Sequence, residues 1–124
     1  MTKTITLYGI NNCDTVKKAQ KWLAANGINY VFFDFKKQSL TCELLAQFVE
    51  LNDWSTLLNM RSTTYRNLSS EIKNNLTNAI AFEQVLAQPT LLKRPLLLIE
   101  TDDSQCVPQL HLGFKAENYQ AIFQ

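Results

Sequence analysis

The order of elements expected near the N-terminus restricts the fold more than any other feature of this sequence. Residues 5–8 form a short apolar run typical of a strand, and apolar residues recur at helical spacing over residues 15–25. Residues 28–34 are almost continuously apolar, which predicts a second strand covered on both faces. A strand, a helix and a strand with short connections predict a parallel pair joined by a right-handed crossover.

A cysteine lies in the connection between the first strand and the helix. Gly9 is a turn residue, and the residues on either side of Cys13 are polar: Asn11, Asn12, Asp14 and Thr15. Cys13 is therefore expected at or just before the helix N-terminus, where unpaired N–H groups and the macrodipole favour a thiolate. Reactive cysteines in such places have pKa values of roughly 3.5–7.5. Lys17, one turn later, adds to the positive field.

Two interpretations of Cys13 follow from the local sequence. In the first, Cys13 is a nucleophilic or redox-active thiol at a helix terminus. In the second, it packs in a core, because free cysteine is among the residue types most often buried. The polar neighbours favour the first interpretation, because a core position normally belongs to an apolar period.

Composition excludes several functional classes. The 124 residues, of which 46% are hydrophobic and 19% charged, are typical of one globular domain. A net charge of +1 produces no field that would favour direct binding of nucleic acid, so any positive patch must be local. No coiled-coil or repeat pattern is present, and we therefore expect a monomer.

Targeting and metal-binding signals are also missing from the sequence. No apolar run approaches the ~18 residues of a membrane span, and residues 1–4 precede no signal-peptide core. The three cysteines, Cys13, Cys42 and Cys106, are too widely separated for a zinc site or a secreted disulfide framework. His111 is the single histidine, and we expect it to be a surface or hydrogen-bonded residue. These features predict a cytoplasmic protein with neither a metal nor a bound cofactor.

The rest of the chain predicts a mixed α/β fold. Helical patterns occupy residues 41–52, 54–58 and 79–87, and a polar stretch covers 59–68. Thr41 is expected to cap the first of these helices and Thr77 or Asn78 the last, and a short helix starts at Ser69 or Ser70. Residues 96–101 and 105–110 read as a hairpin with a turn at 102–104, and residues 116–123 as a last helix. We expect one domain over residues 1–124: a four-stranded mixed sheet with flanking helices and a helical insertion at about residues 40–90.

Four separated motifs resemble one branch of the thioredoxin-like fold. They are residues 8–19 around Cys13, residues 61–68 with an arginine at each end of Arg61-Ser-Thr-Thr-Tyr-Arg66, residues 92–96 with Arg94-Pro95, and residues 112–114 with Tyr119 and Phe123 behind them. Together they make the chain similar to the arsenate reductase (ArsC) and Spx superfamily, and most similar to its YffB-like branch.

The resemblance implies roles for individual residues. Cys13 would be the nucleophile, with Arg61 and Arg94 converging on it, and the Arg94–Pro95 bond would be cis. Guanidinium groups suit an oxyanion or a glutathione carboxylate and also favour a thiolate. The substrate or glutathione would further contact these residues: Asn11, Asn12, Asp14, Thr15, Lys17, Arg66 and Pro95. Alternatively, Arg61, Arg66 and Arg94 are solvated or paired surface arginines.

Departures from the relatives discriminate between activities. Arsenate reductases of this family have a third arginine after a cysteine near the C-terminal hairpin, whereas Val107 follows Cys106 here. Spx-type regulators commonly have a CxxC switch, but Val16 occupies the position three residues after Cys13. Cys42 and Cys106 could resolve an oxidised Cys13 only at Cα separations below about 7 Å, and packing roles are expected for both.

These features predict a glutathione-dependent thiol reductase. Glutathione would be the co-substrate, glutaredoxin a further partner, and the substrate a small oxyanion or a mixed disulfide. Two alternatives stay open: arsenate reduction with glutathione and glutaredoxin, and an Spx-like module that binds RNA polymerase through its surface.

Overall fold

The computed structural model describes residues 3–102 and 107–123, which form two compact units. The sheet unit contains the described residues up to Gln38 and from Arg94 onward, and the helical unit is Ser39–Lys93. The helical unit coincides closely with the insertion predicted at about residues 40–90. The expectation that the two units form a single domain stays a prediction.

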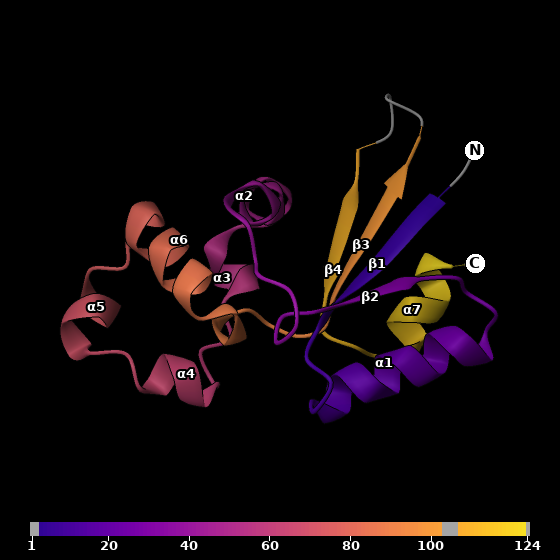
Figure 1. Cartoon of the computed structure of the whole chain (residues 1–124), viewed down its shortest axis with the longest axis horizontal. Coiled ribbons are helices and arrows are strands. Elements are labelled where there is room, and N and C mark those ends of the chain that lie inside the picture. Colours follow the sequence, from indigo (N-terminus) through magenta and orange to yellow (C-terminus); the bar gives the residue numbers. More distant parts are fainter. Residues whose placement is uncertain (1–2, 103–106, 124) are drawn as a thin grey trace. The chain divides into compact units, whose positions relative to one another are not determined.

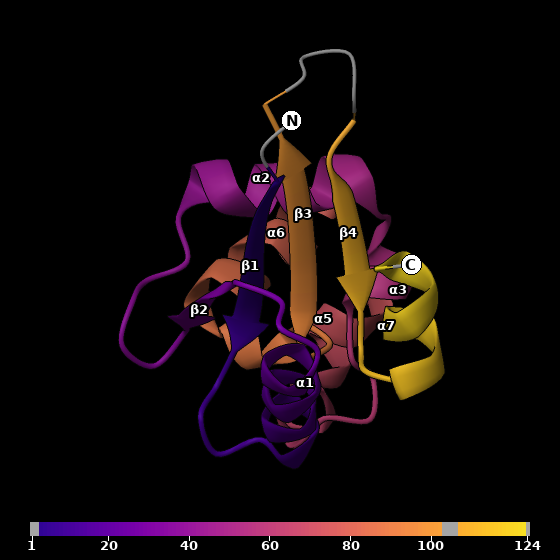
Figure 2. The same cartoon turned by 90° about the vertical axis from the view of Figure 1, so that its right-hand side faces the viewer.

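The sheet unit is built on four strands in the order β2-β1-β3-β4. Their bounds are Lys3–Gly9 for β1, Val31–Asp34 for β2, Leu96–Thr101 for β3 and Gln109–Leu112 for β4. β1 and β2 are parallel, while β1–β3 and β3–β4 are antiparallel (Figure 2). The predicted four-stranded mixed sheet, with a parallel pair joined through a helix, is therefore confirmed.

Two helices, α1 (Asp14–Ala25) and α7 (Ala116–Ile122), pack on one side of this sheet (Figure 1). They enclose a core of eight residues from strands and helices: Ile5, Leu7, Val16, Ala19, Leu23, Leu97, Ile99 and Tyr119. The ring of Tyr119 lies edge-on to Trp22 at 5.6 Å and to Phe114 at 4.7 Å between centroids. Aromatic contacts thus join α7 to α1 on this side of the sheet, as the apolar spacing of both helices predicts.

The helical unit contains five short α-helices and a 3₁₀ turn (Figure 1): α2 Cys42–Leu51, α3 Trp54–Leu57, α4 Thr63–Arg66, α5 Ser70–Asn74, α6 Asn78–Ala87 and η1 Pro89–Leu91. Hydroxyl caps start four of them, because Thr41, Ser62, Ser69 and Thr77 each accept a backbone N–H from the first turn. The sequence predicted the starts at Thr41, Ser69 and Thr77. It missed α4, which Ser62 caps and which lies inside the stretch predicted only as polar.

Two strand predictions need correction. β2 begins at Val31, and 61% of the Val31 surface is exposed, so the expected coverage of both faces is wrong at the start of this strand. β4 covers Gln109–Leu112, where Gln109 pairs with Ile99 and Leu112 with Leu96, whereas residues 105–110 were expected. The predicted turn residues 103 and 104 and Cys106 lie outside the described residues.

Within the described residues, no helix is long and apolar enough to cross a membrane. The longest of the described helices, α1, has 12 residues and an exposed polar face.

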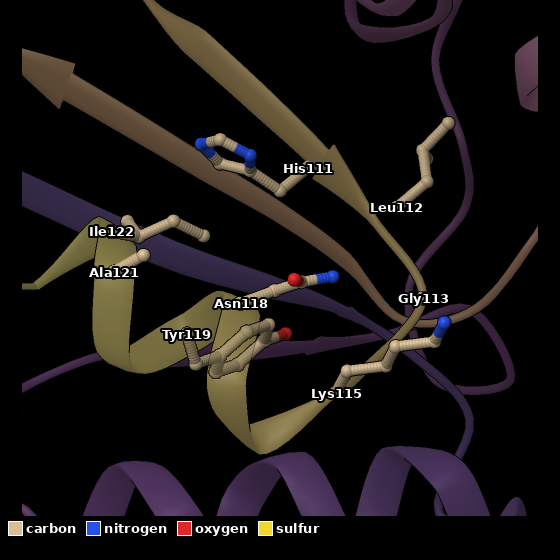
Figure 3. Close-up of a pocket in the computed structure, with 8 residues that line it drawn as sticks. All are labelled: His111, Leu112, Gly113, Lys115, Asn118, Tyr119, Ala121 and Ile122. Atoms are coloured by element: carbon tan, nitrogen blue, oxygen red, sulfur yellow. The ribbon is translucent and has the colours of Figure 1, made fainter.

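A cavity of about 210 Å³ lies between β4 and α7 (Figure 3). Tyr119 lines it, and the Tyr119 hydroxyl is buried with no hydrogen-bond partner. Burial raises the pKa of Tyr119 because it penalises the phenolate. His111 lies across the cavity, where Nε2 is 3.2 Å from Oε1 of Gln109, and partial burial lowers the pKa of this imidazole. None of the predicted catalytic residues lines this cavity.

Gly9 ends β1 at a position of close contact with α1. A Cβ atom at residue 9 would lie 2.7 Å from Cγ2 and 3.2 Å from Cγ1 of Val16. Val16 is fully buried in the first turn of α1, so it has little freedom to move away. Glycine is needed here for close approach of the helix to the strand end.

We predict that Gly9→Ala lowers the free energy of unfolding by about 1–3 kcal/mol, because it overpacks the contact with Val16. Urea denaturation measures the change. Combining it with Val16→Ala, which removes the two clashing methyl groups, should cost less than the sum of the single variants. Strict additivity would contradict the proposed contact.

We also predict that Tyr119→Phe raises the free energy of unfolding by about 1 kcal/mol, because an unpaired buried hydroxyl is costly to desolvate. Tyr30→Phe is the control, since Tyr30 packs against the same core but is only partly buried, and should change stability by less than about 0.5 kcal/mol. A substantial loss of stability in Tyr119→Phe would show that the hydroxyl is hydrogen-bonded in solution.

Candidate functional site

Cys13 is the N-cap residue of α1, as the sequence predicts. Its backbone is extended, with φ −98° and ψ 122°, and its side chain makes no capping hydrogen bond. The first intrahelical bond is donated by the Lys17 N–H to the Cys13 carbonyl at 3.0 Å, so the amides of Asp14, Thr15 and Val16 precede it. These amides and the helix dipole favour a negative charge at this position.

The Cys13 side chain is half-buried and packs against the core cluster of the sheet unit. Both interpretations of this residue therefore describe part of the observed environment. The residue has apolar neighbours in this cluster and is exposed in part to solvent. Such a position is compatible with a nucleophile that is shielded in part from water but still reached by a substrate.

The predicted contact residues near Cys13 are arranged around this helix start. Asn11 and Asn12 form an exposed turn, closed by a hydrogen bond of 3.3 Å from the Cys13 N–H to the Ile10 carbonyl. Asp14 and Lys17 are exposed on α1, whereas Thr15 is half-buried. The structure thus brings these residues together with the thiol in one unit.

Arg94 and Pro95 enter the sheet at the same end. The peptide bond between them is cis, as the resemblance implied. Pro95 is buried, and its carbonyl accepts the Gly113 N–H at 2.9 Å. Leu96, which follows Pro95, pairs with Tyr8 near the end of β1. Arg94 therefore lies at the end of the sheet where β1 terminates and the turn to Cys13 begins.

Arg61 and Arg66 belong to the helical unit. The Arg61 N–H donates to Oδ1 of Asn59 at 3.1 Å, and Ser62 donates to the Asn59 carbonyl at 2.8 Å. This turn precedes α4, whose last residue is Arg66. Both arginine side chains are exposed, and their convergence on Cys13 stays a prediction.

The structure also describes Cys42 and the groups that could bind a metal ion. Cys42 is exposed at the first position of α2, so the packing role expected for it is wrong. Cys106 lies outside the described residues. Residues 3–102 and 107–123 contain no group of three or more His, Cys, Asp and Glu residues that could hold a metal ion.

Two positioning residues were not singled out in the sequence. Gly9 was predicted only as a turn residue, yet it ends β1 and makes close packing of α1 possible. Asp34 is buried at the end of β2, where its side chain accepts the Lys36 N–H at 2.9 Å. The Phe35 N–H donates to the Gly9 carbonyl at 2.9 Å, which ties the loop after β2 to the start of the Cys13 turn. The sequence signal for Asp34 was a single aspartate directly after an apolar run.

Comparisons with solved structures extend the similarity over nearly the whole chain. The YffB protein is 39% identical, with a TM-score of 0.83 and coverage of 95% of this chain and 97% of that one. An arsenate reductase (ArsC) related protein from Brucella melitensis is 44% identical, with a TM-score of 0.74 and coverage of 98% and 95%.

Curated relatives include both uncharacterised and regulatory proteins. An uncharacterised protein of Haemophilus influenzae is 42% identical over 119 residues, which are 96% of this chain and 98% of that protein. The global transcriptional regulator Spx of Lactiplantibacillus plantarum is 28% identical over 98 residues, covering 77% of this chain and 74% of the regulator.

The model of the ArsC family matches residues 8–122, which include Cys13, Arg61, Arg94 and the last helix. The cysteine at the start of α1, the cis proline before β3 and this match agree with one another. The chain belongs to the ArsC family, and it is an arsenate reductase-like protein.

Proposed function

We propose that this protein is a cytoplasmic, glutathione-dependent thiol reductase in which Cys13 is the nucleophile. The observation that carries the proposal is the half-buried Cys13 at the N-cap of a 12-residue helix, with a side chain that makes no capping bond. The uncapped amides of the first turn are available to stabilise a thiolate, and the thiolate is the reactive form.

The reaction consists of two thiol–disulfide exchanges. The Cys13 thiolate attacks the glutathione sulfur of a mixed disulfide, forms a Cys13–glutathione disulfide and releases the substrate as a thiolate. A second glutathione thiolate then attacks the glutathione sulfur of that disulfide. Oxidised glutathione leaves, the Cys13 thiolate is regenerated, and no second protein cysteine is needed. Val16, three residues after Cys13, cannot act as a resolving residue.

Charged and polar groups around Cys13 supply candidate contacts for glutathione. Arg94 presents a permanently charged, forked donor suited to a carboxylate, and Lys17 is exposed one turn into α1. The remaining predicted contacts are Asn11, Asn12, Asp14, Thr15, Arg66 and Pro95, with Arg61 as a second catalytic arginine. Glutaredoxin is a further expected partner, and the protein is expected to act as a monomer.

Reaction with oxidised glutathione across a pH series tests the nucleophile. We predict one glutathione adduct per molecule that forms well below pH 8, and its loss in Cys13→Ser, by intact mass. Cys42→Ser is the matched control and should keep the adduct, although Cys42 is more exposed.

Turnover of 2-hydroxyethyl disulfide with glutathione then tests the enzyme. Wild type should catalyse it and Cys13→Ser should not, while Arg94→Gln should lower kcat/KM about tenfold by loss of a charge-assisted contact. The proposal would be contradicted if Cys13 reacted with the disulfide no faster than free glutathione does.

Arsenate reduction by the same thiolate is a variant of this chemistry. The arsenate reductase-related neighbour from Brucella melitensis supports it, whereas Val107 in place of an arginine removes one anion contact. Arsenate added to the same assay, with glutathione and glutaredoxin, discriminates between the two. Arsenate-dependent turnover would assign the protein as an arsenate reductase.

A regulatory function is the second candidate, supported by the similarity to the regulator Spx. In that case the surface would bind RNA polymerase, and the thiol would be dispensable. Binding of purified RNA polymerase to Cys13→Ser, at the affinity of the wild type and without reductase turnover in either, would favour this function over the enzyme.

A further inference from the structure

We propose that the end of the sheet at which β1 and β2 terminate, next to Cys13, is a cationic docking surface. We also propose that the disulfide substrate is part of an acidic polypeptide segment. This end of the strands is called the Cys13 edge of the sheet. This inference rests on the proposed reductase function and names its substrate class. The net charge of the whole chain is only +1, but cations are concentrated at one end of the sheet unit.

Strand pairing brings four chain segments to this edge. Gly9 at the end of β1 pairs with Asp34 at the end of β2, and Leu96 at the start of β3 pairs with both Tyr8 and Leu112. The segments that leave or enter the sheet here are residues 10–18, 35–38, 94–95 and 113–117. They lie at the lower end of the sheet in Figure 2.

Each of these four segments carries at least one cation. Together with the strand end at Asp34 they contain six cations and three carboxylates. The cations are Lys17, Lys18, Lys36, Lys37, Arg94 and Lys115, and the carboxylates are Asp14, Asp34 and Glu117. All five lysines are exposed, and Figure 3 shows Lys115 beside Gly113 just beyond β4.

Local hydrogen bonds hold two of the lysines in a defined turn. The buried Asp34 accepts the Lys36 N–H at its side chain and the N–H groups of Lys37 and Gln38 at its carbonyl, at 2.9–3.0 Å. The loop is also bonded to β1 through Phe35 and Gly9. The backbone that carries Lys36 and Lys37 is therefore organised before a partner arrives, which lowers the entropic cost of binding.

The opposite end of the sheet has the reverse balance. There, among the described residues, Lys3 is accompanied by Glu100 and Asp102. The strand ends and their connections are thus polarised, with the positive end at the thiol, while the exposed Lys21 lies farther along α1 and is counted at neither end. Such a field accelerates the encounter with an acidic partner and orients it with its disulfide toward Cys13.

Glutathione transfer from matched peptides tests the substrate class. Three glutathionylated peptides of equal length carry glutamate, glutamine or lysine on both sides of the cysteine, and the second-order rate of transfer to Cys13 is measured. Each rate is normalised to the reaction of the same peptide with 2-mercaptoethanol. At about 0.01 M salt, where the screening length is about 30 Å, the acidic peptide should react about tenfold faster than the neutral one. In 1 M salt, where the length is about 3 Å, the preference should vanish.

Two lysine variants locate the effect. Lys37→Gln should lower the rate with the acidic peptide about twofold to threefold at low salt and leave the rate with the neutral peptide unchanged. Lys3→Gln makes the same change of charge at the far end of the sheet and should have little effect.

Equal rates for the three peptides at low salt would overturn the docking surface while leaving the reductase in place. Equal effects of the two lysine variants would overturn its location at this edge. If Cys13 accepted glutathione from none of the peptides, the proposed function itself would fail, and the inference with it.

Discussion

The contact between Gly9 and Val16 determines where α1 begins relative to the sheet. Because no Cβ is present at residue 9, the first turn of the helix lies directly on the end of β1. The short turn between them then leaves Cys13 at the N-cap, with the amides of the first turn beside its side chain. A larger residue at position 9 would displace the helix start, and with it the thiol.

The rest of the sheet unit supports this contact. Val16, Ala19 and Leu23 bury one face of α1 against Leu7 and Leu97, and Tyr119 closes the core from α7. On the other side of β1, the bond from Phe35 to Gly9 secures the loop that follows β2. The pairing of β1 with β2 therefore positions both the turn that carries Cys13 and the loop that carries Lys36 and Lys37.

Much of the fold could be predicted because the signals were local. The apolar run of β3 gave its bounds correctly, and hydroxyl caps at Thr41 and Thr77 marked the starts of α2 and α6. Helix α4 was missed although Ser62 caps it, because its four residues contain no apolar period. Part of its support is also distant in sequence, namely the bond of 2.7 Å between the hydroxyls of Thr64 and Thr90. The exposure of Val31 in β2 was missed because the covering of a strand depends on long-range packing, which an apolar run does not encode.

The site was predictable to a similar degree. A polar turn before a helical period was enough to place Cys13, since a helix N-terminus is a local feature. The role of Gly9 could not be inferred, because it depends on how closely Val16 approaches after packing. The polarity of the sheet unit was equally hidden, since its cations come from four segments that meet only through strand pairing.

The central claim is that folding, by placing Cys13 at the start of α1, makes it a thiolate nucleophile. The direct measurement is the rate of iodoacetamide alkylation at Cys13 at pH 6, followed by peptide mass spectrometry in the native and the urea-unfolded protein. The account predicts that Cys13 is alkylated faster in the native protein than in the unfolded one, because the helix start favours the reactive thiolate. Equal rates would contradict it, because the fold would then contribute nothing to the reactivity of this cysteine.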